Sequence, residues 1–385
     1  MAPTPGPASG PQLSTVRREH ILRELRTHGT VAVGALAAQL GVSPMTVRRD
    51  VNALAAKGLL VRVHGGAALP EPSAGVAPPL APEPAARGSR LTIGLVVPQL
   101  DYYFPRVVAG ARAAAARAGV RLVIRTTAYD PDEDRQQCRR LAEAGVDGLV
   151  VTPMLDGPHV GELLGWLDRL RTPVLLADRR PPEISPFRHL EWVVSDHASG
   201  AATAVWHLHA QGHRRIGLLT IAGTTTSRAL GHGWRDALRA LGIDPDEQVV
   251  GDSDGFDRPG RAELLEATLD EIRRTGTTAL VLHSDPFALT FAQHCQDQGV
   301  RIPDDLAIVA YDDEVAELGD PPLTAVRPPT YDVGRLAVET MVARLTEGDR
   351  RPTHRLLLDP TLTVRSSSVR GPRASHPRPP GGRPS

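Results

Sequence analysis

The chain has 385 residues, 41% of them hydrophobic, with 44 basic and 44 acidic side chains. This length allows two or three domains with sizeable cores, and the composition excludes a fibrous or a wholly disordered chain. No apolar run is long enough to cross a bilayer, and the first ten residues lack the apolar core of a signal peptide, so we expect a cytoplasmic protein without membrane contact.

Charge is distributed unevenly along the sequence. Residues 1–70 carry eight basic and three acidic side chains, a net charge of +5, and the remaining residues carry −5. A basic N-terminal segment on an acidic body is typical of a polyanion-binding domain joined to a domain with a different task.

The N-terminal region, 14–68, is predicted to be a winged helix-turn-helix domain that follows a disordered start at 1–13. A helix over 15–28, a short extended piece over 30–33 and a second helix that ends at Gly41 come first. A third helix and a β-hairpin wing complete the pattern.

The third helix begins at Ser43, whose hydroxyl can cap the first turn, and Pro44 suits the first helical position. Its apolar face consists of Val47, Val51 and Leu54, which repeat at helical spacing. The opposite face is then free to enter the major groove of DNA.

That opposite face and the wing carry the side chains expected at DNA. Arg49 and Met45 are expected to face bases. Two adjacent arginines on a helix are more often a solvated pair, but here they lie in register with a turn, a cap and a wing, which favours DNA contact. The expected DNA-binding residues are Ser43, Met45, Thr46, Arg48, Arg49, Lys57, Arg62 and His64, the last three through the wing.

Three short motifs in this region resemble the DeoR class of bacterial repressor headpieces. They are Arg48-Arg49-Asp50-Val51, Lys57-Gly58-Leu59-Leu60 and Val63-His64-Gly65-Gly66-Ala67, and the resemblance covers about residues 15–68. It implies that double-stranded operator DNA is the partner. Gly34 departs from the class, which carries an acidic residue at the start of the second helix.

A proline-rich linker over 69–89 separates this region from a body in which apolar strands alternate with amphipathic helices. The predicted strands are 91–97, 121–126, 148–152, 173–177, 216–221, 279–282 and 306–310, and the predicted helices include 105–118, 198–211 and 286–298. This alternation predicts an α/β fold with parallel sheets flanked by helices. About 280 residues are too many for one such sheet, so two lobes are expected.

Five motifs in the body resemble the effector domain of LacI/GalR regulators, which has a two-lobed, periplasmic-binding-protein-like fold. They are Gly145-Val146-Asp147-Gly148-Leu149-Val150, Gly212-His213-Arg214-Arg215-Ile216, Ile302-Pro303-Asp304-Asp305, Tyr311-Asp312-Asp313 and Pro321-Pro322-Leu323-Thr324-Ala325-Val326-Arg327. The resemblance places the ligand-binding domain at 90–368, with lobe one over about 91–195 and 328–355 and lobe two over about 197–326 and 357–368. The tail, 369–385, is expected to be disordered.

Ligands of open α/β lobes bind at the carboxyl ends of the strands, and polar or aromatic residues follow several predicted strands. These candidates are Asp101, Tyr103, Phe104, Thr226, Arg228, Ser284, Asp285 and Asp312, with Phe256 as a stacking platform. The resemblance implies that these positions line the cleft and that Asp312 accepts hydrogen bonds from hydroxyls. Tyr103 or Phe104 could instead cap the core. Asp312 could be a turn residue, and Arg228 could pair with a nearby carboxylate on the surface.

The nature of the ligand follows from departures from the family pattern. Leu230 and Ala202 stand where many relatives carry arginines, and Pro328 where a glutamine is frequent. The cleft is therefore expected to be less cationic than a purine- or phosphate-binding version, which favours a neutral sugar, polyol or nucleoside.

No residue arrangement predicts catalysis or a cofactor. His207 and His209 point in nearly opposite directions on a helix, so they cannot chelate one metal ion. His283-Ser284-Asp285 contains the residue types of a hydrolase relay, but adjacent side chains diverge. Cys138 and Cys295 are expected to be unpaired thiols in or beside helices. We therefore expect no enzyme activity, no metal and no cofactor.

These patterns predict a homodimeric, ligand-responsive transcriptional regulator, with repression favoured, of a sugar or related small-metabolite operon. The alternative is a cytoplasmic sugar-binding or sugar-modifying protein whose headpiece no longer functions. Deletion of the headpiece separates the two, because only a regulator then loses DNA affinity.

Overall fold

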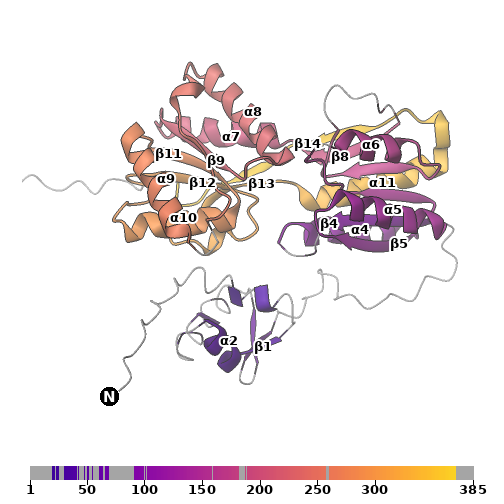
Figure 1. Cartoon of the computed structure of the whole chain (residues 1–385), viewed down its shortest axis with the longest axis horizontal. Helices are drawn as coiled ribbons and strands as arrows, with labels where there is room; N and C mark the ends of the chain where they lie inside the picture. The colour runs from indigo at the N-terminus through magenta and orange to yellow at the C-terminus, as the bar shows by residue number, and fades with distance from the viewer. Residues whose placement is uncertain are drawn as a thin grey trace, which may run out of the picture.

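Figure 1 shows the computed structural model of the protein. The structure describes residues 20–21, 23–25, 30–40, 42, 47, 50–51, 54, 60–63 and 66–68 of the N-terminal region and 91–98, 100, 102–157, 159–181, 187, 189–256 and 260–369 of the body. Within these residues, no helix combines the length and the apolar character that a membrane span needs.

Three short strands of the N-terminal region form an antiparallel sheet in the order β1-β3-β2. They are β1 Thr30–Ala32, β2 Val61–Val63 and β3 Gly66–Ala68, and helix α2, Val33–Leu40, follows β1 directly. Val47, Val51 and Leu54 are helical and at most 3% exposed. The predicted apolar face of the third helix is therefore confirmed, and β2 and β3 form the predicted hairpin. The extended piece ends before Val33, because that residue already begins α2.

Lobe one is a six-stranded, all-parallel sheet in the order β14-β8-β7-β6-β4-β5. Its strands are β4 Thr92–Pro98, β5 Arg121–Thr127, β6 Gly148–Val151, β7 Val174–Ala177, β8 Glu191–Ser195 and β14 Arg355–Leu358. Helices α4 (Phe104–Ala118) and α11 (Thr330–Glu347) cover one face, and α5 (Pro131–Glu143) and α6 (Val160–Asp168) cover the other. In β6, Val150 faces the first pair of helices and Leu149 and Val151 face the second, as the two-residue period of a strand requires.

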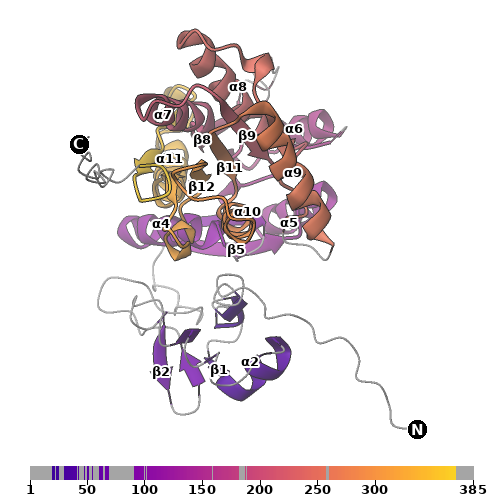
Figure 2. The ribbon, with the colours of Figure 1, turned by 90° about the vertical axis from the view of Figure 1, so that its left-hand side faces the viewer.

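Lobe two has the same construction, with one antiparallel edge. Its strand order is β10-β9-β11-β12-β13-β15, and only β15 runs antiparallel to its neighbour. The strands are β9 Ile216–Thr220, β10 Val250–Asp252, β11 Ala279–His283, β12 Ala307–Tyr311, β13 Thr324–Arg327 and β15 Thr361–Thr363. Figure 2 shows helices α7 (His197–Ala210) and α8 (Thr225–Ala240) on one side of this sheet and α9 (Arg261–Thr275) and α10 (Asp285–Asp297) on the other. Short 3-10 turns, η1 Pro245–Glu247, η2 Ala316–Leu318 and η3 Gly348–Arg350, complete the body.

The chain crosses between the lobes three times, at residues 196, 328–329 and 359–360. The amide of Asp196 donates to the carbonyl of Leu358 at 2.8 Å, which ties the first crossing to the third. The return to lobe two starts later than expected from sequence, because Leu357 and Leu358 still pair with Val194 and Ser195 in lobe one.

Two helix pairs approach so closely that only glycine fits at the contact. A Cβ added to Gly334 of α11 would lie 1.8 Å from the carbonyl oxygen of Val107 in α4, and one on Gly233 of α8 would lie 1.9 Å from that of Ala198 in α7. Both contacts place backbone against backbone, so neither can be relieved by rotating a side chain.

Candidate effector-binding cleft

The carboxyl ends of the parallel strands of both lobes face each other across one cleft. Tyr102 and Tyr103 follow β4, and Asp178 follows β7, all from lobe one. Asp312 follows β12 of lobe two, and its carboxylate accepts a hydrogen bond of 3.0 Å from the Tyr102 hydroxyl across the cleft. This is the position at which open α/β folds bind small ligands.

Backbone strain collects at the same strand ends. Tyr102, Asp178 and Asp312 have φ angles of 52°, 60° and 110°. Residues with a Cβ avoid this left-handed region, and those that adopt it cluster at ligand sites. The three strained residues therefore mark the strand ends that form the cleft.

Asp178 anchors the lobe-one wall. Its carboxylate accepts a 2.8 Å hydrogen bond from the Tyr103 hydroxyl and forms an ion pair with Arg179. Burial raises the pKa of Asp178, and the Arg179 guanidinium and the Tyr103 hydroxyl oppose this rise. The guanidinium of Arg179 also lies 5.9 Å from the centre of the Phe104 ring and makes a cation–π contact with it.

Asp312 is the corresponding carboxylate of lobe two. It is 4% exposed, and burial, followed by the nearby Asp285 carboxylate, raises its pKa well above the ordinary value. The hydrogen bond from Tyr102 opposes this rise. Among the described residues no Lys or Arg side chain pairs with Asp312, so this buried carboxylate can gain from a ligand hydroxyl that donates to it.

Asp285 supports this wall without reaching the cleft. It is fully buried, and its two carboxylate oxygens accept from the backbone amides of Asp313, Glu314 and Val315 at 3.2, 2.7 and 3.0 Å. Burial raises the pKa of Asp285 to about 7, and these amides oppose the rise. Its role is to fix the loop after β12 that presents Asp312.

Two histidines complete the polar floor. The Nδ1 atom of His197 lies 2.9 Å from the Tyr311 hydroxyl, and the Nε2 atom of His283 lies 3.9 Å from Asp312. Burial, and then nearby positive charge, lowers the pKa of both histidines to about 3. Both rings are therefore uncharged at neutral pH, and Nδ1 of His283 has no hydrogen-bond partner among the residues that the structure describes.

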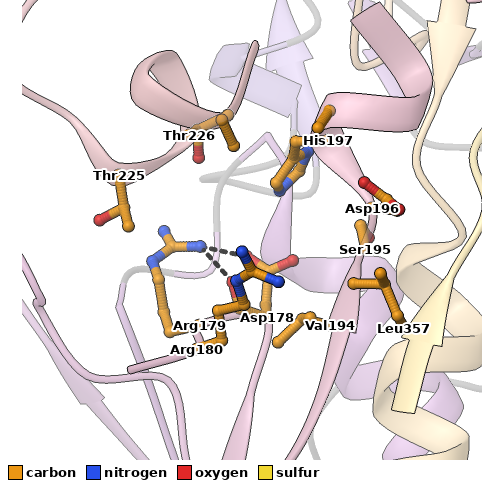
Figure 3. Close-up of a pocket in the computed structure, with 12 residues that line it drawn as sticks. Asp178, Arg179, Arg180, Val194, Ser195, Asp196, His197, Thr225, Thr226 and Leu357 are labelled. Atoms are coloured by element: carbon orange, nitrogen blue, oxygen red, sulfur yellow. Dashed lines mark hydrogen bonds and ion pairs between the residues drawn. The ribbon is translucent and has the colours of Figure 1, made fainter. Parts of the chain in front are cut away.

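A cavity of about 80 Å³ lies between the lobes and is lined by His197, but not by Tyr311, His283 or Asp312. Figure 3 shows Arg179 and Arg180 reaching into it from lobe one and His197 and Thr226 facing them from lobe two. Ser195, at the end of β8, also lines it.

Direct contacts hold the two lobes together beside the cavity. Asp156, in the loop after β6, accepts hydrogen bonds of 2.8 Å from both the Thr225 hydroxyl and the Arg228 guanidinium of α8. Arg106 of α4 lies 3.8 Å from Glu314 of lobe two. We call the two hydrogen bonds to Asp156 the Asp156 latch. They join residues of the two lobes that are about 70 positions apart in the sequence.

The structure gives different outcomes for the candidates from sequence. Tyr103 and Asp312 lie in the cleft walls, and Thr226 lines the cavity. Arg228 pairs with Asp156, which is the surface-partner alternative, although the pair spans the two lobes. Ser284 is 7% exposed and precedes the first residue of α10. Asp101 lies outside the described residues.

Two aromatic candidates belong to the core instead of the cleft. Phe256 is fully buried and stacks on Phe291 with ring centres 5.6 Å apart, so it cannot serve as a stacking platform for a ligand. Phe104 is 2% exposed and packs in the core of lobe one, as the core-capping alternative states.

Sequence reasoning missed Asp178, Arg179, Ser195 and His197. Asp178 and Arg179 directly follow the predicted strand 173–177, so the strand-end rule applied to that strand would have found them. Ser195 and His197 follow β8, which was not predicted, and no motif marks them.

Most expected DNA-binding residues lie outside the described part of the chain. These are Ser43, Met45, Thr46, Arg48, Arg49, Lys57 and His64. The backbone of Arg62 lies in β2, in the wing.

No group of three or more potential metal ligands occurs in the part of the chain that the structure describes. His207 of α7 instead lies 2.7 Å from the Ser368 hydroxyl. Cys138 and Cys295 are free, buried thiols in α5 and α10, as expected, and burial raises the pKa of Cys295 to about 12.

Comparisons with known proteins agree with this architecture. Residues 17–73 match the DeoR-like helix-turn-helix domain, and residues 205–368 match the periplasmic binding protein-like domain. The ribose operon repressor of Haemophilus influenzae is 30% identical over 284 residues, which are 72% of this chain and 80% of that protein. The transcriptional repressor CytR of Escherichia coli is 29% identical over 294 residues, covering 73% of this chain and 80% of CytR. The solved complex of the transcriptional regulator CelR with cellobiose is 26% identical, with a TM-score of 0.61 over 85% of this chain and 91% of CelR.

Proposed function

Because the chain belongs to the LacI family of transcriptional regulators, we propose that it is a ligand-responsive repressor whose headpiece binds an operator and whose cleft binds a small effector. The observation that carries this proposal is the polar cleft, in which groups from both lobes converge on one cavity. Such a cleft couples ligand binding to the relative position of two rigid lobes. We place its effector among sugars, polyols and nucleosides or their derivatives, in line with the sugar named for the ribose repressor and for the CelR complex.

The coupling that we propose is a population shift in a homodimer. Effector in the cleft favours closed lobes, which changes the distance or orientation of the two headpieces. Operator half-sites about 34–36 Å apart then match only one state. LacI-type regulators use a hinge helix after the headpiece, whereas this chain has the proline-rich segment 69–89, so the signal must pass either through docking of that segment or through dimerisation itself.

Because the sequence contains no catalytic arrangement, we propose that the cleft binds its effector without converting it. We also propose that the protein acts in the cytoplasm. The test uses the full chain. An operator is first selected from random duplex DNA, and sugars, polyols and nucleosides are screened by thermal shift. Compounds that stabilise the protein are then added to the operator complex. The proposal predicts that at least one of them changes operator affinity; selection of no sequence, or chemical conversion of a bound compound, would contradict it.

A further inference from the structure

Two consecutive tyrosines bind the two carboxylates of the cleft. The Tyr103 hydroxyl donates to Asp178 at 2.8 Å, and both residues belong to lobe one. The Tyr102 hydroxyl donates to Asp312 at 3.0 Å, and this hydrogen bond crosses from lobe one to lobe two. Of these two contacts, only the one made by Tyr102 breaks when the lobes move apart.

Tyr102 fills the space beside Asp312. Its ring packs against the apolar cluster that includes Val315 and Leu318 of lobe two. Burial, followed by the nearby carboxylates, raises the pKa of its hydroxyl well above the ordinary value, so this group stays protonated and acts as a donor. Among the described residues, it provides the one hydrogen bond to the Asp312 carboxylate. The cavity between the lobes does not extend to Asp312.

The cavity that remains between the lobes is too small for the effectors proposed above. Its volume is about 80 Å³. Pockets that hold small molecules measure about 300–1,000 Å³. A sugar or a nucleoside can therefore reach the Asp312 carboxylate only after the lobes have opened and the Tyr102 side chain has moved away from it.

The Asp312 side of this contact is fixed, whereas the Tyr102 side is held in an unfavourable conformation. The loop that carries Asp312 is anchored by Asp285, whose buried carboxylate accepts from three successive backbone amides. Tyr102 lies in the turn before α4 with a φ of 52°, in the left-handed region that residues with a Cβ avoid. Loss of the contact would let this turn relax, so Tyr102 is the partner that we expect to move.

We propose that Tyr102 is a built-in competitor of the effector. Its phenol occupies the place beside Asp312 that a hydroxyl-bearing part of the effector takes, and the effector binds by displacing it. An effector hydroxyl then donates to the Asp312 carboxylate instead of the Tyr102 hydroxyl, so this buried group keeps its hydrogen bond. A compound without a hydroxyl at this point would leave the carboxylate unpaired and would be rejected. This inference rests on the proposed effector role of the cleft.

The first probe is p-cresol, which is the tyrosine side chain as a free molecule and requires no knowledge of the effector. Tyr102→Gly removes the phenol, and glycine adopts a φ of 52° without strain, so the variant should fold. In calorimetry this full-length variant should bind p-cresol with a dissociation constant of about 1 mM or tighter. Toluene, which lacks the hydroxyl, should bind at least about tenfold more weakly. The wild type, in which Tyr102 fills the place, should bind neither compound at about 1 mM.

A second variant, Tyr102→Phe, keeps the ring and removes only the hydroxyl. Compounds selected by the thermal-shift screen should bind it at least about threefold more tightly than the wild type, because displacing a phenylalanine breaks no hydrogen bond to Asp312. The same compounds should displace p-cresol from Tyr102→Gly. The matched control is Tyr331→Phe, which removes a hydroxyl from a residue of α11 that is 38% exposed and should bind these compounds like the wild type.

Failure of this inference and failure of the proposed function give different results. The inference is overturned if Tyr102→Gly does not bind p-cresol at about 10 mM, if toluene binds it equally well, or if Tyr102→Phe and Tyr331→Phe have the same affinity for the screened compounds. In those cases a compound that changes the operator affinity of the wild type leaves the proposed function intact. If p-cresol binds as expected but no compound changes operator affinity, the proposed function fails, and the role of Tyr102 as a competitor of the effector fails with it.

Discussion

The Asp156 latch should set how far the lobes open in the absence of effector. Asp156→Ala removes two hydrogen bonds of 2.8 Å, one from the Thr225 hydroxyl and one from Arg228. The hydrogen bond from the Thr225 hydroxyl, which is only partly buried, contributes about 0.5–1.5 kcal/mol. The ion pair contributes only about 0.2–1 kcal/mol, because the Arg228 side chain is 53% exposed. We therefore expect the closed state to lose about 1–2 kcal/mol relative to the open state, a roughly 5- to 30-fold shift.

Spin-label distance measurements can test this shift directly. Ala116 of α4 and Ala240 of α8 are exposed and lie in different lobes, and a cysteine at each accepts a label. The native thiols, Cys138 and Cys295, are buried and should stay unlabelled.

The distance distribution of the effector-free protein should gain a longer component in Asp156→Ala. The matched control is Asp236→Ala, which breaks an exposed pair within α8, between Asp236 and Arg239. If Asp156→Ala and Asp236→Ala give the same distribution, the latch does not control lobe opening and the reasoning above fails.

Four further experiments probe other parts of the molecule. Arg49→Ala should cost about 1–3 kcal/mol at a single operator base pair, and equal weakening on all sequences in a binding assay would make this residue a phosphate contact. Asp312→Ala should abolish effector-induced thermal stabilisation while operator binding without effector persists; retained stabilisation would place the effector elsewhere. Gly334→Ala should lower the free energy of unfolding by about 1–3 kcal/mol because of its backbone clash, whereas Gly161→Ala, with open space around it, should not destabilise the protein in urea. The pKa of about 3 at His283 lies below the value of roughly 6.5 in the unfolded chain, so protons favour unfolding as the pH falls below about 6.5. Between pH 7 and 5 the wild type should lose about 1–2 kcal/mol more stability than His283→Phe, and parallel pH profiles would contradict this assignment.

Sequence patterns predicted the α/β architecture and the inner strands of both lobes because the apolar residues of these elements follow clear periods. All seven predicted strands and all three named helices of the body are present, with ends that differ by one residue. Strand β8 was missed because its pattern is interrupted by Glu191 and Trp192, and the carboxylate of Glu191 is buried through its contact with Arg344. Arg344, which pairs with Glu191, lies 153 positions away, so the sequence around Glu191 does not indicate that this carboxylate can be buried in a strand.

The site was less predictable because its members belong to both lobes. The strand-end rule places residues such as Tyr103 and Asp312 near the cleft, but it cannot tell which side chains turn inwards. Phe256 illustrates the difficulty, since only the three-dimensional packing shows that Phe291 covers its ring. The position of Ser195 at the cavity and the meeting of α7 with α8 there are likewise visible only in the folded chain.

The three crossings between the lobes have a consequence for biosynthesis. Lobe one needs α11 and β14, which are translated only after all but the last strand of lobe two. At about 5–20 residues per second, the ribosome takes roughly 7–27 s to proceed from the end of β8 to the start of α11. During that interval α11 is not yet available to pack against α4 through Gly334. The apolar face of α4 is therefore exposed to chaperones and proteases. A message that stops before residue 330 therefore cannot yield a truncated regulator with one intact lobe, and the headpiece is the only predicted domain whose whole sequence leaves the ribosome early.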